Sequence, residues 1–302
     1  MDGAGVGHVM RPAYVTTAAV RGGFEDLESL IEAFRSSGIP AIELGWAPRP
    51  RAGDVTNTIA SYAGTAFLVH NYFPAPVEPF VLNLASADET VRQRSLEMAT
   101  TNLRMSARIG APFYSVHAGF SANFHPESLG HALEREAVVP RADAEATFRR
   151  SILSLASLAS KLGVDLLIEP NVVDRRNLVD GRNTLLLFAE AGEIVEFLRA
   201  IDHPRVGLLL DVGHLNVSAQ TLGFDREEFV DAVAPWVRGL HIHENDGNAD
   251  QHRPLEAGSW ALCLTRDPRF VACPVVLESV FGSVAEAAEH RAWFDGTRGL
   301  SN

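Results

Sequence analysis

Cysteine is nearly absent from this chain of 302 residues, which has only Cys263 and Cys273, and neither belongs to a CxxC motif. Two cysteines exclude a disulfide scaffold and favour a reduced, cytoplasmic setting. No apolar run approaches the roughly 20 residues that a membrane-spanning helix needs. The N-terminus also lacks the basic segment, followed by an apolar one, of a signal peptide. We therefore expect a cytoplasmic protein with no membrane partner.

Positive charge is also scarce, since 26 Lys and Arg stand against 38 Asp and Glu, a formal net charge of −12. A nucleic-acid backbone favours a basic surface, so we do not expect nucleic acid as a partner. Apolar residues make up 46% of the chain, which is enough for a large core. An α/β barrel commonly fills a chain of this length as one domain.

Eight short apolar, β-rich runs alternate with helical patterns along the chain. Such alternation predicts a parallel sheet with crossover helices. Eight strands in this length predict a (β/α)₈ TIM barrel, a single domain over residues 1–302 with barrel strands from about 13 to 279. The predicted strands are 14–18, 41–46, 66–71, 113–118, 165–170, 206–212, 239–244 and 274–279.

Amphipathic spacing predicts helices between these strands, with Gly38 and Gly163 placed to end two of them. Two connections are long. Residues 119–142 follow the fourth strand and are interpreted as a lid, and residues 171–185 follow the fifth. The predicted helices are 24–34, 89–109, 144–162, 186–200, 226–237 and 284–293.

Six consecutive strands, the third to the eighth, have an ionisable residue at or just beyond their carboxyl ends. Closing a barrel gathers these ends at one mouth, where active sites of this fold are built. Histidine, aspartate and glutamate are the ligands of zinc, manganese and similar ions, so we predict a divalent-metal site. The candidate ligands are His70, His117, Glu169, Asp211, His214, His243, Asp250, His252 and Glu278.

Other residues are candidates for substrate contacts. His241 lies on the same strand face as His243, one layer deeper, and is interpreted as supporting the site or touching the substrate. Arg175, Arg182 and Arg253 either belong to solvated loops or clamp a phosphate or carboxylate. Two aromatic residues past the second and third strands either pack in the core or form an apolar wall for the substrate. These two are Trp46 and Tyr72.

Four strand ends carry a resemblance to a known family. The sequences Leu166-Leu-Ile-Glu-Pro170, Leu210-Asp-Val-Gly-His214, His243-Glu-Asn-Asp246 and Val276-Leu-Glu-Ser279 resemble the ligand-bearing ends of the xylose isomerase-like barrels. That superfamily includes ketose epimerases, sugar isomerases and endonuclease IV repair enzymes. The resemblance implies that Glu169, Asp211, His243 and Glu278 hold one metal ion. It also implies that Glu169 and Glu278 form the acid/base pair.

The endonuclease IV branch is matched at further positions. His70-Asn-Tyr-Phe73 resembles its third-strand segment, and Asp250-Gln-His252 resembles its Asp-x-His pair. All nine positions of that branch's three-metal cluster thus have counterparts here. The chain departs from the branch in two places. Leu255-Glu-Ala-Gly258 replaces its Gly-x-Gly, and no proline follows His117.

These patterns support one leading hypothesis and several alternatives. The leading hypothesis is an isomerase or epimerase of a sugar-like polyhydroxy carbonyl compound, with one Zn²⁺ or Mn²⁺ ion. The first alternative is an endonuclease IV-like phosphodiesterase with two or three zinc ions. A lyase or dehydratase of the same superfamily would use nearly the same residues. A non-catalytic binding barrel is the remaining class. Each hypothesis allows a homo-oligomer.

Overall fold

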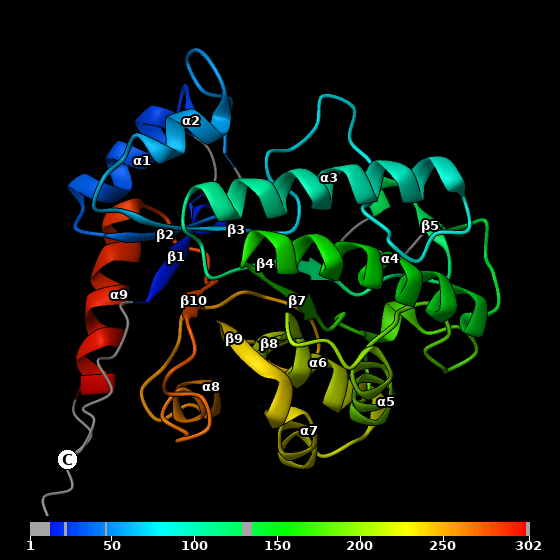
Figure 1. The fold of residues 1–302 in the computed structure, drawn as a ribbon. Coiled ribbons are helices and arrows are strands. Elements are labelled where there is room, and N and C mark those ends of the chain that lie inside the picture. Colours follow the sequence, from blue (N-terminus) through cyan, green and yellow to red (C-terminus); the bar gives the residue numbers. More distant parts are fainter. Residues whose placement is uncertain (1–12, 21–22, 46, 129–134, 300–302) are drawn as a thin grey trace, which may run out of the picture.

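Eight parallel strands close into one barrel in the computed structural model, which describes residues 13–20, 23–45, 47–128 and 135–299 (Figure 1). The hydrogen-bonded order around the barrel is β1-β10-β9-β8-β7-β4-β3-β2. The predicted (β/α)₈ barrel is therefore confirmed. Its strands are β1 (Tyr14–Thr16), β2 (Ala41–Leu44), β3 (Ala66–Val69), β4 (Phe113–His117), β7 (Asp165–Glu169), β8 (Val206–Asp211), β9 (Val237–Ile242) and β10 (Val275–Leu277).

Helices cover the outside of the barrel, with α3 and α4 side by side across one face (Figure 1). Among the described residues they are α1 (Leu27–Ser36), α2 (Val55–Ala60), α3 (Glu89–Arg108), α4 (Arg141–Leu162), α5 (Ala191–Ile201), α6 (Val212–Leu222), α7 (Arg226–Val233), α8 (Trp260–Leu264) and α9 (Val284–Gly299). Three of these were not predicted, namely α2, α6 and α8. The helix predicted over 186–200 begins only at Ala191. None of the described helices is long and apolar enough to cross a membrane.

Capping residues explain where several helices begin and end. Asp26 and Ser29 form a reciprocal capping box at the start of α1. Gly163 ends α4 with a φ of 72°, in the left-handed region that favours glycine, as predicted. The Asp211 carboxylate accepts a hydrogen bond from the His214 backbone N–H, so α6 begins directly at the end of β8. This cap holds Asp211 at the barrel mouth.

The barrel interior changes from apolar to polar along the strand direction. One buried layer of strand residues is apolar, including Leu167 and Leu209. Side chains two positions apart point to the same face of a strand, so the next layer toward the carboxyl ends is also inward. That layer comprises Thr16, Glu43, His70, Ser115, Glu169, Asp211, His241 and Glu278. The fold therefore places the ionisable residues directly above a packed apolar floor.

The long connections after β4 and β7 lie against each other beyond the barrel mouth. Ser121 and Leu187 donate backbone hydrogen bonds to Leu185 and Gly119, respectively, at 2.8 and 3.1 Å. A second apolar cluster, which includes Phe124 and Leu186, packs between the two connections. The first connection contains a short antiparallel pair, β5 (Asn123–Phe124) with β6 (Arg135–Glu136). Four 3₁₀ turns are found along the described chain, η1 (Thr17–Ala19), η2 (Pro126–Ser128), η3 (Arg175–Asn177) and η4 (Ala234–Trp236). The lid predicted over 119–142 includes residues 129–134, which lie outside the described residues.

Candidate metal centre

Four side chains from four strands converge at the barrel mouth. One potential ligand atom from each of Glu169, Asp211, His241 and Glu278 lies within 4.8 Å of the other three. His241 Nδ1 is 3.1 Å from Glu278 Oε2, 3.5 Å from Glu169 Oε1 and 3.9 Å from Asp211 Oδ2. These four residues are called the central group below.

The donor atoms of the central group lack hydrogen-bond partners. Both Glu169 oxygens, Asp211 Oδ2, His241 Nδ1 and Glu278 Oε2 are buried without one. Buried polar atoms without a partner are costly, and several such atoms converging on one point are best satisfied by a shared cation. Three carboxylates and an imidazole are also a donor set that zinc or manganese accepts. The residues therefore fit the divalent metal that the sequence predicts.

The structure places His241, and not His243, in the central group. His241 pairs directly with Asp211 in the register between β8 and β9, and both side chains point into the barrel. His243 lies beyond the end of β9, with its Nε2 3.4 Å from Asp211 Oδ1 and 3.4 Å from Asp250 Oδ1. The family resemblance implied His243 for this place, with His241 one layer deeper on the same strand face. The alternation along the strand puts both on one face, and the register between β8 and β9 decides that His241 is the one level with Asp211.

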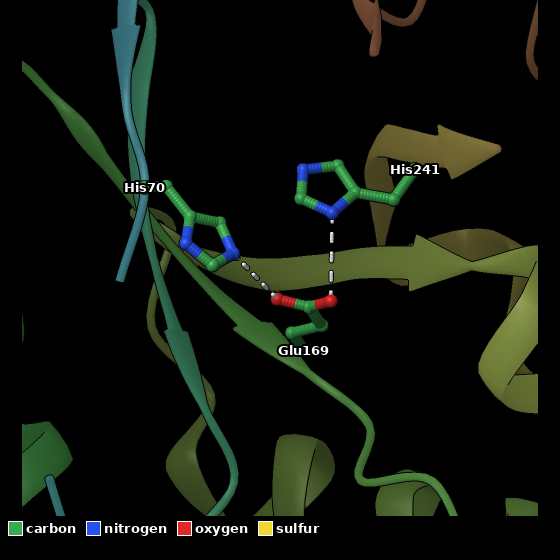
Figure 2. A group of neighbouring side chains, drawn as sticks. All are labelled: His70, Glu169 and His241. Atoms are coloured by element: carbon green, nitrogen blue, oxygen red, sulfur yellow. Dashed lines mark ion pairs between the residues drawn. The ribbon is translucent and has the colours of Figure 1, made fainter. Parts of the chain in front are cut away.

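Two further histidines contact the central group from β3 and β4. His70 Nε2 is 3.9 Å from Glu169 Oε2 and 4.0 Å from Glu278 Oε1, and His117 Nε2 is 3.7 Å from Glu169 Oε2. Figure 2 shows His70 and His241 reaching the two oxygens of Glu169 from different strands. His117 and Glu169 are register partners across β4 and β7. The Glu169 carboxylate thus links the other members of the central group to this second pair of histidines.

A third set of side chains lies around Asp250. His214 Nε2 is 3.4 Å and His252 Nε2 is 2.9 Å from Asp250 Oδ2. Two backbone hydrogen bonds of 2.8 Å between Glu244 and Arg253 close the intervening loop and return it to the mouth. His252 has a φ of 48°, a left-handed conformation that histidine adopts more readily than branched residues do. All nine predicted ligand positions therefore converge, and His241 joins them.

Glu43 is a buried part of the site that the sequence analysis did not single out. Its Oε1 atom lies 2.9 Å from His241 Nε2, and both residues have an exposed fraction of 0%. A carboxylate on one imidazole nitrogen fixes the ring orientation and leaves the other nitrogen for a metal. The signal in the sequence was a lone acid inside the apolar strand Ala41–Leu44. An acid in that position has to find a buried partner.

The protonation states follow from this crowding. Burial raises the pKa of the Glu169 carboxyl, but His117 and His241 outweigh it and the net pKa is lowered. Burial lowers the pKa of His241, yet the carboxylates of Glu43 and Glu278 hold it well above its usual value. For His252 the hydrogen bond to Asp250 likewise exceeds the burial effect and raises the pKa to about 9. In the metal-free protein, the raised pKa values of His241 and His252 therefore favour imidazolium–carboxylate pairs at these two positions.

A cavity of about 440 Å³ opens beside the central group, in the range typical of small-molecule sites. Glu169, Glu278 and the predicted contact residue Tyr72 line it. Arg175, Arg182 and Arg253 have exposed side chains and are not among its lining residues, so the structure does not bring the predicted clamp to this cavity. The remaining predicted wall residue, Trp46, lies outside the described residues.

A barrel with clustered candidate metal ligands at its carboxyl-terminal mouth defines a class of protein whose members place their chemistry there. Residues 31–265 match the family model described as the xylose isomerase-like TIM barrel, and the chain belongs to that family. It is 22% identical over 232 residues to fructoselysine 3-epimerase of Escherichia coli O157:H7, covering 73% of each chain. It is 25% identical over 219 residues to the probable endonuclease 4 of Aquifex aeolicus, covering 67% of this chain and 68% of the relative. A solved L-ribulose 3-epimerase structure superimposes with a TM-score of 0.69 at 17% identity, over 96% of this chain and 94% of its own.

Proposed function

We propose that the protein is a divalent-metal-dependent isomerase or epimerase of a sugar-like polyhydroxy carbonyl compound. The observation that carries this proposal is the central group, whose unpartnered donor atoms border a small-molecule cavity. The similarity to a curated fructoselysine 3-epimerase supports it. Glu169, Asp211, His241 and Glu278 would hold one Zn²⁺ or Mn²⁺ ion. When bound, the ion polarises a carbonyl oxygen and lowers the cost of an enediolate.

Glu169 and Glu278 are the residues proposed to move the proton. Both line the cavity, and their neighbouring histidines keep the pKa of each carboxyl below its usual value despite burial. Each carboxylate is therefore ionised at neutral pH and able to accept a proton from carbon. In the proposed reaction one glutamate removes the proton and the other, once protonated, returns a proton to the substrate. Return of a proton to the same carbon from its other face gives epimerisation. Return to the neighbouring carbon, with a hydroxyl proton passing between the two oxygens of the enediolate, gives isomerisation.

Exchange with solvent tests this function directly. Metal-loaded protein is incubated in D₂O with a panel of ketoses and keto-glycosides, and the products are analysed by NMR and mass spectrometry. A proton exchanged through the glutamates leaves deuterium at the reacting carbon. An active enzyme that forms product without any deuterium would rule out the proton-transfer mechanism.

A phosphodiesterase of the endonuclease IV type is the second candidate. The specific observation in its favour is that all nine positions matched to a three-metal cluster, His243 included, lie in overlapping groups in and around the central group. The similarity to curated endonuclease 4 proteins supports it as well. Against it stand the charge of −12 and a cavity without lining Lys or Arg among the described residues.

Metal content and cleavage assays separate the two candidates. Plasma emission spectrometry of carefully purified protein should find about one ion per chain for the isomerase and about three for the hydrolase. Zinc-loaded protein is then offered duplex DNA with a single abasic site. Cleavage that disappears in Glu169→Gln would favour the hydrolase.

A further inference from the structure

We propose that the substrate is unphosphorylated and joins its polyhydroxy carbonyl part to an apolar, ring-sized group. The polyhydroxy carbonyl part of the substrate rests on the proposed function. The apolar ring and the absence of a phosphate rest on the residues that line the cavity. The ring-sized group would lie on four aromatic side chains, called the aromatic wall below. The wall consists of Tyr72, Phe80, Phe120 and Phe124.

The cavity is lined by two unlike sets of residues. His117, Glu169, His214, Asp250, His252 and Glu278 come from the strand ends and the Asp250 loop and belong to the metal-ligand clusters. The aromatic wall instead comes from the connections after β3 and β4, with Leu186 from the connection after β7 adding to it. A compound that fills the cavity therefore meets oxygen and nitrogen donors with one part and carbon surface with the other.

The aromatic wall is built before any ligand arrives. The rings of Phe120 and Phe124 meet edge to face at 5.1 Å, and those of Tyr72 and Phe80 do so at 5.6 Å. The Asn83 amide donates hydrogen bonds to the backbone carbonyls of Phe120 and Ala122, at 3.2 and 3.1 Å. Edge-to-face packing is the arrangement that aromatic pairs prefer. Phe120 nevertheless stays half-buried, so its ring leaves carbon surface to be covered.

Charge around the cavity argues against a phosphate on the substrate. Among the residues that the structure describes, the lining includes Glu169, Asp250 and Glu278 and three histidines but no Lys or Arg. Phosphates in proteins are bound by Arg or Lys side chains or by helix N-termini, because a dianion needs compensating positive charge. Arg94 lies 4.3 Å from the centre of the Phe80 ring, yet it does not line the cavity and donates to the Glu78 carbonyl. A phosphorylated sugar would bring two negative charges to a wall that offers no Arg or Lys among the described residues to pair with them.

Hydrogen-bonding groups near the wall are few. The Asn171 amide, which lines the cavity, already donates to the backbone carbonyls of Ala118, Gly119 and Leu187. Asn177 Oδ1 is a buried acceptor without a partner in the same cavity and would receive one hydroxyl from the substrate. A second sugar ring carries many hydroxyl groups that each need a partner. An aryl or similar apolar ring suits this part of the cavity better.

Calorimetry with matched ligands tests the inference. Methyl and phenyl β-glycosides of oxidised hexoses that keep a ring carbonyl group (keto-glycosides), together with the corresponding hexose 6-phosphates, are titrated into metal-loaded protein. We expect at least one phenyl glycoside to bind roughly tenfold tighter than its methyl partner, because its ring is buried against aromatic surface. The phosphates should bind more weakly than the methyl glycosides.

Variants locate the effect. Phe120→Ala and the milder Phe120→Leu should reduce the preference for the phenyl group to about threefold or less. Phe224→Ala should keep it, because Phe224 stacks on Phe229 away from the cavity. A phenyl-to-methyl ratio near one in the intact protein overturns the inference. So does tighter binding of a phosphate, or no phenyl glycoside binding at about 10 mM.

The two experiments can contradict the further inference and the proposed function independently of each other. If the phenyl preference is present but no substrate exchanges deuterium, the proposed function fails and the assignment of the aromatic wall stands. If deuterium exchange occurs with simple or phosphorylated sugars and phenyl groups give no advantage, the function stands and the further inference fails.

Discussion

Glu43 Oε1 lies 2.9 Å from His241 Nε2, deep inside the barrel where neither side chain is exposed to solvent. The contact fixes the plane of the imidazole, so that Nδ1 points at Glu169, Asp211 and Glu278. A carboxylate behind a metal-binding histidine both orients the ring and strengthens it as a ligand.

Weakening this contact should therefore weaken metal binding. We expect Glu43→Ala to lower metal affinity by about 10–100-fold, the usual range for such supporting residues. Glu43→Gln keeps an oxygen that can accept the hydrogen bond and should lose less. Affinity is measured by competition with a chelator, with Glu97→Gln on the exposed side of α3 as the control. Equal affinities for Glu43→Ala and the intact protein would show that the contact has no part in metal binding.

Removing either proposed proton carrier should abolish turnover. Glu169→Gln and Glu278→Gln keep the size of the side chain but remove the basic carboxylate. Each should lower kcat by about 10²–10⁴-fold or more, the range for general acid–base catalysis. The exposed Glu256→Gln serves as the control. Retention of full activity in either variant, with its metal still bound, would remove that glutamate from the mechanism.

Metal removal should lower thermal stability. The proposed metal would bind the unpartnered donors of the central group in the folded state only, so each ion would stabilise that state by mass action. At a metal concentration 100 times Kd the gain is about 2.7 kcal/mol. A change of that size corresponds to a Tm shift of roughly 5–10 °C. Differential scanning fluorimetry with and without chelator measures it. An unchanged Tm, in protein shown by elemental analysis to have lost its metal, would contradict a shared metal site.

The pH dependence of the metal-free protein should report the Asp250–His252 pair. The pKa of His252 is about 9 in the folded protein against 6.5 for an unperturbed histidine. The folded state binds this proton more tightly, so the resulting stability is fully present below pH 6.5 and is lost as pH rises through 9. We expect Tm to fall by a few degrees across this window. His252→Gln should flatten part of the decline, and an identical slope in this variant would show that the pair is not responsible.

Gly213 should tolerate no side chain. An added Cβ atom would lie 1.9 Å from His243 Cε1 and 2.2 Å from its Nε2. Gly213→Ala should therefore displace His243 and cost about 1–3 kcal/mol of unfolding free energy, as overpacking does. Gly192→Ala is the matched control, because it also lies in the first turn of a helix and a Cβ there meets nothing within 4 Å. It should be neutral or stabilising by up to about 1 kcal/mol. Denaturant unfolding of both variants provides the comparison, and equal stabilities would contradict this account of Gly213.

Much of the fold could be read from local pattern. Strands buried on both faces appear as short apolar runs, and all eight barrel strands were located that way. Helices α3, α4 and α9 are long enough to show helical spacing, whereas α2 and α8 span only six and five residues. α6 is buried on several sides and begins at a residue already assigned to a strand. Such segments carry no clear amphipathic period.

By itself, the sequence determined which residue types stand at the strand ends. Only the tertiary structure decided which of them share a point in space. His241 and His243 lie on the same face of one strand, and only the register of the closed barrel decides which of them is level with Asp211. Glu43 lies 198 residues from His241, and no local pattern links them. Arg175 and Arg182 follow a strand as the ligands do, but their loop directs them to solvent. A two-residue period fixes the face of a strand on which a side chain lies, and the packing of the whole barrel sets its neighbours.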